Sequence, residues 1–250
     1  MARQGQCIAV VSGKGGTGKT SFSASVGSAL AQRGQRVLCI DCDVGLRNLD
    51  LALGLTDRAL MDFSDVALER CPLETAVVEH DRIQGLYLLT APVSSRGRPI
   101  TLVQMSRLME QARRKFDYCL LDAPAGLRDG FLLATCDADR CVVVTTADNS
   151  SLRDAQHTVM ELNHFPTGRL HLVVNRVRKK MMRSMHATID DAIDKAGLPL
   201  LGVVPEDDDL LLSMSRGNAL LTVSNGPAAT AYRNIARRLQ GERVPLMRVK

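Results

Sequence analysis

Residues 13–20 read Gly-Lys-Gly-Gly-Thr-Gly-Lys-Thr and match the pattern G-x-x-x-x-G-K-[ST] directly after an apolar run. Glycines in this pattern let successive backbone N–H groups point at phosphate oxygens, and the N-terminus of the helix that follows adds partial positive charge. Lys19 is placed to neutralise the β- and γ-phosphates of a nucleotide, and Thr20 offers a hydroxyl to Mg²⁺. The residues that we expect to bind the nucleotide here are Gly13, Lys14, Gly15, Gly16, Thr17, Gly18, Lys19, Thr20 and Ser21.

Lys14 is a second lysine on the same loop, directly after the first glycine. On so tight a turn, its side chain cannot easily fold back to the loop's own phosphates. It can instead reach outward to a nucleotide held by a second subunit and stabilise the charge that develops there during phosphoryl transfer. The alternative is a solvated loop cation.

Four further polar segments each follow an apolar run that is typical of a strand. Two begin with acids, Asp41 and Asp122, and the other two are Asn175-Arg176 and residues 205–207. A carboxylate that ends a buried strand beside a phosphate loop is costly unless a metal ion or hydrogen bonds compensate it. An asparagine offers the edge of a base both a donor and an acceptor. These segments are therefore candidates for contacts to a metal ion and to a base.

The loop resembles that of the deviant Walker A family of P-loop ATPases, which reads K-G-G-x-G-K-[ST]. The similarity covers nearly the whole chain and includes Asp41-Cys-Asp43-Val-Gly-Leu-Arg-Asn-Leu-Asp50 and Asp122-Ala-Pro-Ala-Gly126. These two segments are similar to those of the family members that place the bacterial division septum. The resemblance implies a P-loop fold, ATP and Mg²⁺ as cofactors, and an ATPase that cycles between an ATP-bound dimer and an ADP-bound monomer.

The same resemblance implies a role for each matching residue. Lys14 would reach across an ATP-dependent homodimer and Asp43 would orient the attacking water, so that Lys14, Lys19 and Asp43 form the catalytic set. Thr20 would bind Mg²⁺, and Asp122 would act on the ion largely through water. The residues implied to frame the adenine are Asn175, Arg176, Pro205, Glu206 and Asp207.

Two of the acidic residues keep alternative roles. Asp41 and Asp43 end the same strand, and the sequence leaves open which one touches water and which one packs or caps. The family pattern favours Asp43 for the water, and Asp41 stays a further candidate for the metal site. Residues 122–126 could form a plain turn, but Asp122 follows an apolar strand at the expected place, which favours its metal role.

Apolar runs that alternate with helical segments predict the architecture that positions these residues. The runs are continuous, as burial on both faces requires, and the helical segments end at signals such as Gly34, Pro166 and Gly197. We expect one doubly wound, mostly parallel α/β sheet with amphipathic crossover helices on both faces, in a single domain over residues 1–250. The expected strands are 7–12, 36–41, 86–90, 118–122, 141–146, 170–175 and 200–204, and the expected helices are 19–33, 102–115, 151–163, 186–196 and 228–240.

The composition excludes several classes of protein. With 250 residues, 45% hydrophobic and 24% charged, and a net charge of +5, the chain is neither disordered nor fibrous. Aromatic residues make up only 3% and Trp is absent, which argues against a stacking platform for single-stranded nucleic acid. No apolar run approaches the roughly 20 residues that span a bilayer, and the N-terminus lacks the apolar region of a secretory signal. We therefore expect a cytoplasmic protein.

The seven cysteines lie mostly in apolar runs and are better interpreted as reduced, buried side chains than as a disulfide framework. Cys39 and Cys42 form a C-x-x-C pair, which can hold a metal or carry out redox chemistry. That function usually needs a second pair or a following helix, whereas Cys39 lies in a predicted strand. We expect no cofactor at this pair.

Two features bear on surface partners. Residues 176–183 carry five cations and no acid, a run that could face anionic lipid, nucleic acid or a partner subunit but is more often solvated. Septum-placing relatives reach the membrane through a C-terminal amphipathic helix, whereas Pro245 in the last ten residues predicts no such helix here. The explanations are a shortened sequence, recruitment to the inner face of the membrane by a partner, or a weaker lipid contact through the basic run.

The favoured function is an ATP-driven switch that places the division septum. Its expected partners are a second copy of the chain, a division inhibitor, and an activator or topological factor. One alternative keeps the fold but places flagella or partitions DNA, although specific nucleic-acid binding is not expected. Another is an iron–sulfur carrier, which needs cysteines that the sequence does not supply at the expected places, since Cys136 lacks a Gly-rich setting and no cysteine follows Cys141.

Overall fold

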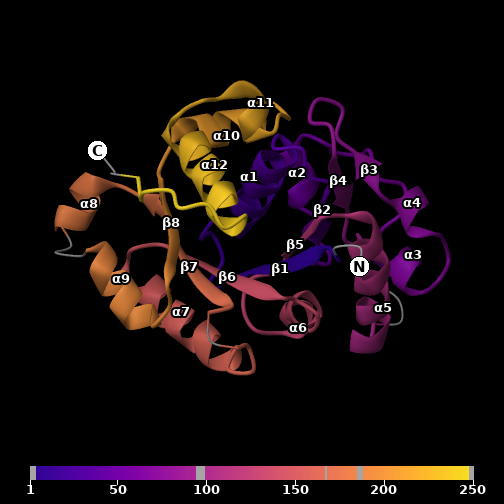
Figure 1. Cartoon of the computed structure of the whole chain (residues 1–250), viewed down its shortest axis with the longest axis horizontal. Helices are drawn as coiled ribbons and strands as arrows, with labels where there is room; N and C mark the ends of the chain where they lie inside the picture. The colour runs from indigo at the N-terminus through magenta and orange to yellow at the C-terminus, as the bar shows by residue number, and fades with distance from the viewer. Residues whose placement is uncertain (1–3, 94–98, 167, 185–187, 248–250) are drawn as a thin grey trace.

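The computed structural model describes residues 4–93, 99–166, 168–184 and 188–247 (Figure 1). Within these residues, eight strands form one sheet in the order β3-β4-β2-β5-β1-β6-β7-β8. Neighbouring strands are parallel, except for the antiparallel pair β3 and β4 at one edge. The expected doubly wound, mostly parallel sheet is confirmed. The strands are β1 (Gln6–Val11), β2 (Val37–Asp41), β3 (Val78–Glu79), β4 (Leu86–Leu89), β5 (Tyr118–Asp122), β6 (Arg140–Thr145), β7 (Leu170–Val177) and β8 (Leu200–Pro205).

Helices cover both faces of the sheet, with α1, α2 and α10–α12 on one face and α3–α7 and α9 on the other (Figure 1). Successive residues of β1 alternate between the two cores: Ile8 and Val10 join one, and Ala9 and Val11 join the other. No helix of the described residues is long and apolar enough to cross a bilayer. The helices are α1 (Lys19–Ala31), α2 (Leu49–Leu53), α3 (Phe63–Ala67), α4 (Leu73–Ala76), α5 (Leu102–Lys115), α6 (Asp129–Thr135), α7 (Asn149–Glu161), α8 (Lys179–Ser184), α9 (Ile189–Ala196), α10 (Asp208–Ser215), α11 (Leu220–Val223) and α12 (Pro227–Leu239).

Helix α1 differs from the amphipathic helix that we expected over residues 19–33. Of its 13 residues, 11 are buried, because α2 and α12 pack against it in addition to the sheet. Small residues permit this close packing: a Cβ on Gly27 would lie 2.5 Å from Sγ of Cys39. The expectation was wrong because a second layer of helices covers α1, and the periodicity of one segment carries no information about that layer.

The elements that the sequence did not predict are short. Strand β3 has two residues, and the additional helices α2, α3, α4, α6, α8, α10 and α11 have 4–8 residues each. One or two turns contain too few apolar positions to reveal a helical period. The helix expected over 186–196 begins at Ile189, after the capping residue Thr188, and positions 185–187 lie outside the described residues.

Parallel pairing brings the carboxyl ends of β1, β2, β5, β7 and β8 to one edge of the sheet. Asp41, the last residue of β2, is directly opposite Asp122, the last residue of β5. At the other half of this edge, Val177 of β7 is opposite Pro205 of β8. The polar segments that the sequence singled out therefore follow strands that end side by side.

Candidate nucleotide-binding site

The loop between β1 and α1 has the shape and the free donors that phosphate binding requires. Gly16 and Gly18 adopt left-handed conformations with φ of 80° and 90°, which glycine reaches without steric cost. A Cβ on Gly18 would lie 2.2 Å from Nδ2 of Asn175, whereas one on Gly16 would meet nothing within 4 Å. Helix α1 begins at Lys19 with no side-chain cap and no acid in its first turn. Its first N–H groups are therefore open to an anion, and the loop fits the phosphates of a nucleotide.

Lys19 is a buried cation with an incomplete set of partners. Its Nζ donates a hydrogen bond to Oγ of Ser12 at 2.8 Å, and Ser12 Oγ donates to the carbonyl of Lys14 at 2.7 Å. No carboxylate of the described residues lies within ion-pair distance of Nζ. Burial lowers the pKa of Lys19, while the charges of Asp122 and Asp43 oppose that shift. A phosphate would supply the missing negative charge.

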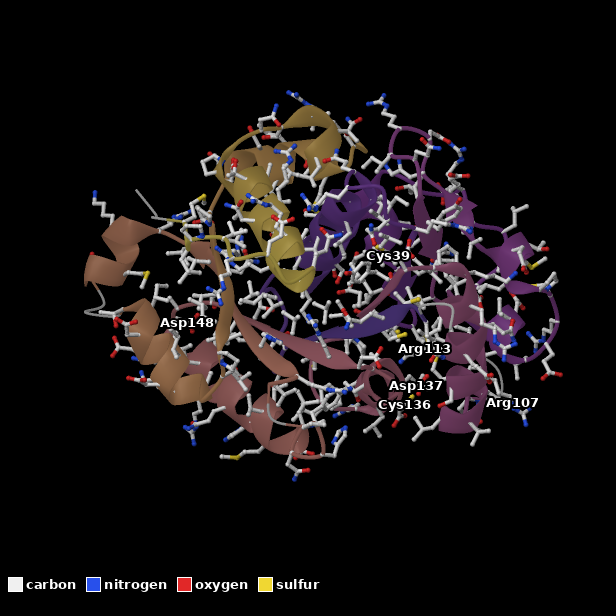
Figure 2. All side chains as sticks on the ribbon, in the orientation of Figure 1. Cys39, Arg107, Arg113, Cys136, Asp137 and Asp148 are labelled. Carbon is white, nitrogen blue, oxygen red and sulfur yellow. The ribbon has the colours of Figure 1, made fainter. Side chains whose placement is uncertain are left out.

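Lys14 lies on the outside of the same loop. Its side chain is exposed and forms no ion pair with a described residue. The charge of Lys14 acts on Asp148, which caps the start of α7 and is labelled in Figure 2. Although burial raises the pKa of Asp148, hydrogen bonds from Thr146 and Ser151 and the Lys14 charge bring it down to about 2. The structure therefore separates the two lysines of the loop, one inside and one outside.

The remaining loop residues fix the position of the loop against its neighbours. A Cβ on Gly13 would lie 2.4 Å from the carbonyl of Asp154 on α7, which explains why glycine occupies this position. The Thr17 side chain is buried and its hydroxyl has no partner among the described residues. The Ser21 hydroxyl lies 3.9 Å from Sδ of Met214 on α10.

Asp122 is the acid that the structure places against the start of α1. It is buried and accepts hydrogen bonds from the hydroxyls of Thr20, at 2.7 Å, and Ser23, at 2.8 Å. Burial and the charge of Asp41 raise the pKa of Asp122 to about 7, against the hydrogen bonds and the Lys19 charge. A cation would favour the charged carboxylate, and hydroxyl and carboxylate oxygens suit Mg²⁺. These oxygens therefore fit Mg²⁺.

Two contributors to this arrangement were missed at the level of sequence. Ser12 is the last residue before the loop, and Ser23 lies one helical turn after Thr20. Because positions three apart share a helix face, the spacing from Thr20 to Ser23 was the available signal. The described residues hold no group of three His, Cys, Asp or Glu side chains that could bind a metal. An ion such as Mg²⁺ does not need such a group, because one or two protein oxygens hold it together with phosphates and water.

Asp41 supports the loop that follows β2. Its carboxylate accepts from the backbone N–H of Asp43 at 2.8 Å and from that of Leu49, the first residue of α2, at 3.1 Å. Burial raises the pKa of Asp41 to about 6, although these two hydrogen bonds lower it. Because both oxygens are committed to backbone donors, the arrangement favours the capping role for Asp41 over the metal role.

Asp43 is free to act on a solvent molecule. It is half-buried, and its carboxylate forms no hydrogen bond with a described residue. It lines a cleft of about 810 Å³ between the loops after β2 and β5 and helices α3 and α5. Burial raises the pKa of Asp43, and the charge of Lys19 opposes the shift. Of the two acids after β2, Asp43 therefore has the free carboxylate.

The two buried carboxyls predict a pH dependence for the nucleotide-free protein. Both pKa values, about 7 for Asp122 and about 6 for Asp41, lie above the roughly 4 of an unfolded chain. The native state thus keeps protons that the unfolded chain releases between pH 4 and 7, so their contribution to the free energy of unfolding falls as pH rises through this window. We expect Asp122→Asn to stabilise the protein by roughly 2–4 kcal/mol at pH 8 and by much less at pH 5.

Urea unfolding with a metal chelator at both pH values measures this difference. Asp57→Asn is a suitable control because Asp57 is exposed and has a φ of 59°, which asparagine tolerates. An equal effect of Asp122→Asn at pH 5 and pH 8 would contradict the prediction.

The end of β7 is tied to the phosphate loop. Asn175 is buried, and its Nδ2 donates a hydrogen bond to the carbonyl of Thr17 at 2.8 Å. Arg176 has a φ of 55° and donates from Nη1 to the carbonyl of Gly16 at 3.1 Å. Two consecutive side chains therefore hold the loop from the side on which a base is expected.

The segment after β8 lies beside this strand end. Glu206 donates its N–H to the carbonyl of Val177 at 3.1 Å, and its carboxylate pairs with Arg178 and lies 3.9 Å from Nη2 of Arg176. Asp207 caps α10 and also accepts from the N–H of Ala228, in the first turn of α12, at 3.0 Å. The structure thus brings together the residues for which the sequence implied a base-framing role.

These contacts also change the interpretation of the basic run 176–183. Arg176 and Arg178 interact with Glu206 and belong to the frame just described. Lys180 is exposed on α8, and the side chains of Lys179 and Arg183 lie outside the described residues. Two of the five cations therefore lie beside an acid, and their charge is partly neutralised.

The C-x-x-C pair does not form a site. Cys39 belongs to the core on the α1 face of the sheet, whereas Cys42 belongs to the core on the opposite face. Cys136, which is exposed, does not join the pair either, because Figure 2 shows it in a different part of the molecule from Cys39. Both cysteines of the pair are free and buried. Because the two side chains lie in cores on opposite faces of the sheet, they are not placed to bind one metal ion together.

Comparisons with known proteins agree with this geometry. The CobQ/CobB/MinD/ParA nucleotide binding domain family matches residues 8–221. A septum site-determining protein MinD from Bacillus subtilis is 39% identical over 248 residues, which cover 97% of this chain and 91% of the relative. The chain belongs to the MinD family. This confirms the resemblance to deviant Walker A ATPases.

Solved structures extend the comparison to the fold. A chain of the MinC:MinD cell division protein complex from Aquifex aeolicus has a TM-score of 0.89 and 35% identity, covering 97% of this chain and 98% of that one. MinD from Pyrococcus horikoshii, solved in complex with Mg-ADP, has a TM-score of 0.81 and 28% identity, covering 94% and 95%. The MinD-family chain thus has the nucleotide-binding fold of its family.

Proposed function

We propose that this MinD-family protein is a single-domain, Mg²⁺-dependent ATPase that dimerises when it binds ATP and thereby places the division septum. ATP bridges two subunits, and slow hydrolysis, raised by an activating partner, returns them to monomers. The γ-phosphate orders the loops that follow β2 and β5, and its loss releases them. Septum site-determining relatives that match this chain over 97% of its length support the assignment.

The observation that carries the proposal is that two lysines on one loop lie in different environments, one buried and one exposed. Lys19 is buried at the start of α1 and lacks a carboxylate partner, as a ligand for the bound nucleotide's own phosphates should. Lys14 is exposed and forms no ion pair with a described residue. A cation held outside its own site can act on the nucleotide of a second subunit.

The other site residues take the roles that their contacts allow. Thr20 and Asp122 would hold Mg²⁺, which neutralises charge on the β- and γ-phosphate oxygens. Asp43 orients the attacking water with its free carboxylate. Asn175 and Arg176, together with residues 205–207, frame the adenine. The Mg-ADP complex of the Pyrococcus horikoshii relative supports this choice of nucleotide and metal.

Exposed apolar side chains near the site support dimerisation. They lie on the loops and short helices that follow β2, β5 and β8, and Leu46, the most exposed of them, has 68% of its surface accessible. Apolar surface of this kind is stabilised by burial at about 25 cal/mol per Å². The side chains are Val44, Leu46, Leu51, Leu127, Leu132, Leu211 and Leu212. A second subunit that meets the nucleotide edge would cover part of this surface.

A division inhibitor of the MinC type is the partner with direct support. The Aquifex aeolicus relative was solved as a MinC:MinD complex. We further propose that an activating or topological-factor protein binds the dimer and raises its slow rate of hydrolysis.

The Asp43→Ala variant tests the proposal. We expect turnover of ATP to fall by about 10²-fold, while ATP binding persists and the protein accumulates as a dimer with ATP but not with ADP. Light scattering with each nucleotide and a phosphate-release assay measure both quantities. Glu161→Ala, at an exposed acid in the last turn of α7, should dimerise and turn over ATP as the wild type does. A variant that stays monomeric with ATP would show that Asp43 has a different role.

A further inference from the structure

Ser23 carries a buried hydroxyl that bonds to the end of β5 rather than to its own helix, α1. Its Oγ donates a hydrogen bond to Oδ1 of Asp122 at 2.8 Å, and the residue is fully buried. A serine inside a helix often donates instead to the carbonyl four residues earlier. Ser28 of the same helix does so, with the carbonyl of Ala24 at 2.7 Å. The Ser23 hydroxyl is therefore committed to a carboxylate on another element.

Close packing of α1 on the sheet puts Ser23 within reach of this carboxylate. Sγ of Cys39, on β2, lies 3.8 Å from the Ser23 carbonyl. One turn further along the helix, a Cβ on Gly27 would lie 2.5 Å from the same sulfur and 3.3 Å from the side chain of Leu120 on β5. Because there is little room for a side chain at Gly27, the helix can lie close to both strands. The position of the Ser23 hydroxyl is thus set by the packing of the helix backbone.

The orientation of the Asp122 carboxylate depends on two hydroxyls among the described residues. Thr20 donates to Oδ2 at 2.7 Å and Ser23 donates to Oδ1, and no described backbone N–H donates to either oxygen. By contrast, two backbone N–H groups hold the carboxylate of Asp41. The terminal torsion of an aspartate has broad energy wells, so a carboxylate that is held at one oxygen can rotate. Since the Thr20 hydroxyl is itself expected to bind the metal ion, the Ser23 bond is the contact that acts on the carboxylate alone.

We propose that Ser23 is a positioning residue of the metal site, which holds Oδ1 of Asp122 and thereby keeps Oδ2 beside the Thr20 hydroxyl for Mg²⁺. A group that orients a metal-binding side chain through a hydrogen bond raises metal affinity, and its loss typically costs about 10- to 100-fold. The inference rests on the proposed function, in which Thr20 and Asp122 hold Mg²⁺ in the nucleotide complex.

Removal of this hydroxyl alone is the test. Ser23→Ala keeps the helix, because alanine has the highest helix propensity and is no larger than serine. By calorimetric titration of Mg²⁺ into the complex of the protein with ADP, we expect the Mg²⁺ dissociation constant to rise roughly ten-fold. The ADP dissociation constant in a metal chelator should change by less than about three-fold, because Ser23 acts on the metal site and not on the phosphate loop.

Ser28→Ala is the matched control, because it removes another buried hydroxyl of α1, one that bonds to the backbone of its own helix. It should leave both dissociation constants unchanged. An unaltered Mg²⁺ dissociation constant in Ser23→Ala would overturn the inference. An equal weakening of ADP binding with and without Mg²⁺ would also overturn it, since that result indicates that Ser23 only packs α1 against the sheet. A wild-type ADP complex that binds no Mg²⁺ would instead overturn the proposed function.

Discussion

Lys19→Met is expected to raise the dissociation constant for ADP by about two to three orders of magnitude, because it removes the only buried positive side chain on the phosphate loop. Methionine keeps the apolar stem that packs at the start of α1 but cannot neutralise phosphate. In the wild type, burial lowers the pKa of Lys19 because the charged form is costly to bury without a ligand. The nucleotide-free variant should therefore be as stable as the wild type or more stable.

Calorimetric titration and urea unfolding measure these two effects, which have opposite signs. Lys115→Met is a suitable control, because Lys115 is at the surface on α5 and pairs with Glu74 there. It should bind ADP normally. A change of less than about five-fold in the ADP dissociation constant of Lys19→Met would mean that Lys19 does not face the phosphates.

Lys14→Ala should abolish turnover while leaving the nucleotide in place. The side chain is exposed and lies outside its own site, so we expect the ADP dissociation constant to change by less than about three-fold. A cation supplied by another subunit contributes roughly 10³-fold or more to phosphoryl transfer. We expect a loss of that size in ATP turnover, together with loss of the ATP-dependent dimer.

Phosphate release and light scattering at saturating ATP measure the two losses. Lys180→Ala removes another exposed cation, from the basic run on α8, and should change neither. Turnover within about three-fold of the wild type in Lys14→Ala would identify Lys14 as a solvated loop cation, which was the alternative interpretation of the sequence.

Long, continuous features of this fold could be predicted from the sequence because they depend on local patterns. Strands β2 and β5 are buried at every position, and their uninterrupted apolar runs report this directly. Features that depend on neighbours distant in sequence could not be predicted. The burial of α1 requires α12, which follows it by almost 200 residues. Short helices such as α10 are set by a cap at Asp207 and contacts with α12 rather than by their own periodicity.

The same distinction applies to the site. The phosphate loop could be identified from eight adjacent residues. The choice between Asp41 and Asp43 depended instead on which carboxylate accepts hydrogen bonds from the backbone of the loop that follows. That answer appears only in the hydrogen bonds from Asp43 and Leu49 to Asp41.

The two bonds from the end of β7 to the phosphate loop, Asn175 to Thr17 and Arg176 to Gly16, make the loop preorganised. Fixing a flexible backbone costs about 1–2 kcal/mol per residue, and a nucleotide that enters an already fixed loop avoids most of that entropy loss. A loop of constant shape does not rearrange when ATP is converted to ADP. We expect the rearrangement to occur in the loops after β2 and β5. Asp41 anchors the first of these loops near both of its ends. On the proposed function, we expect separate segments to capture the nucleotide and to sense its third phosphate. The first is held in place by β7, and the second should rearrange.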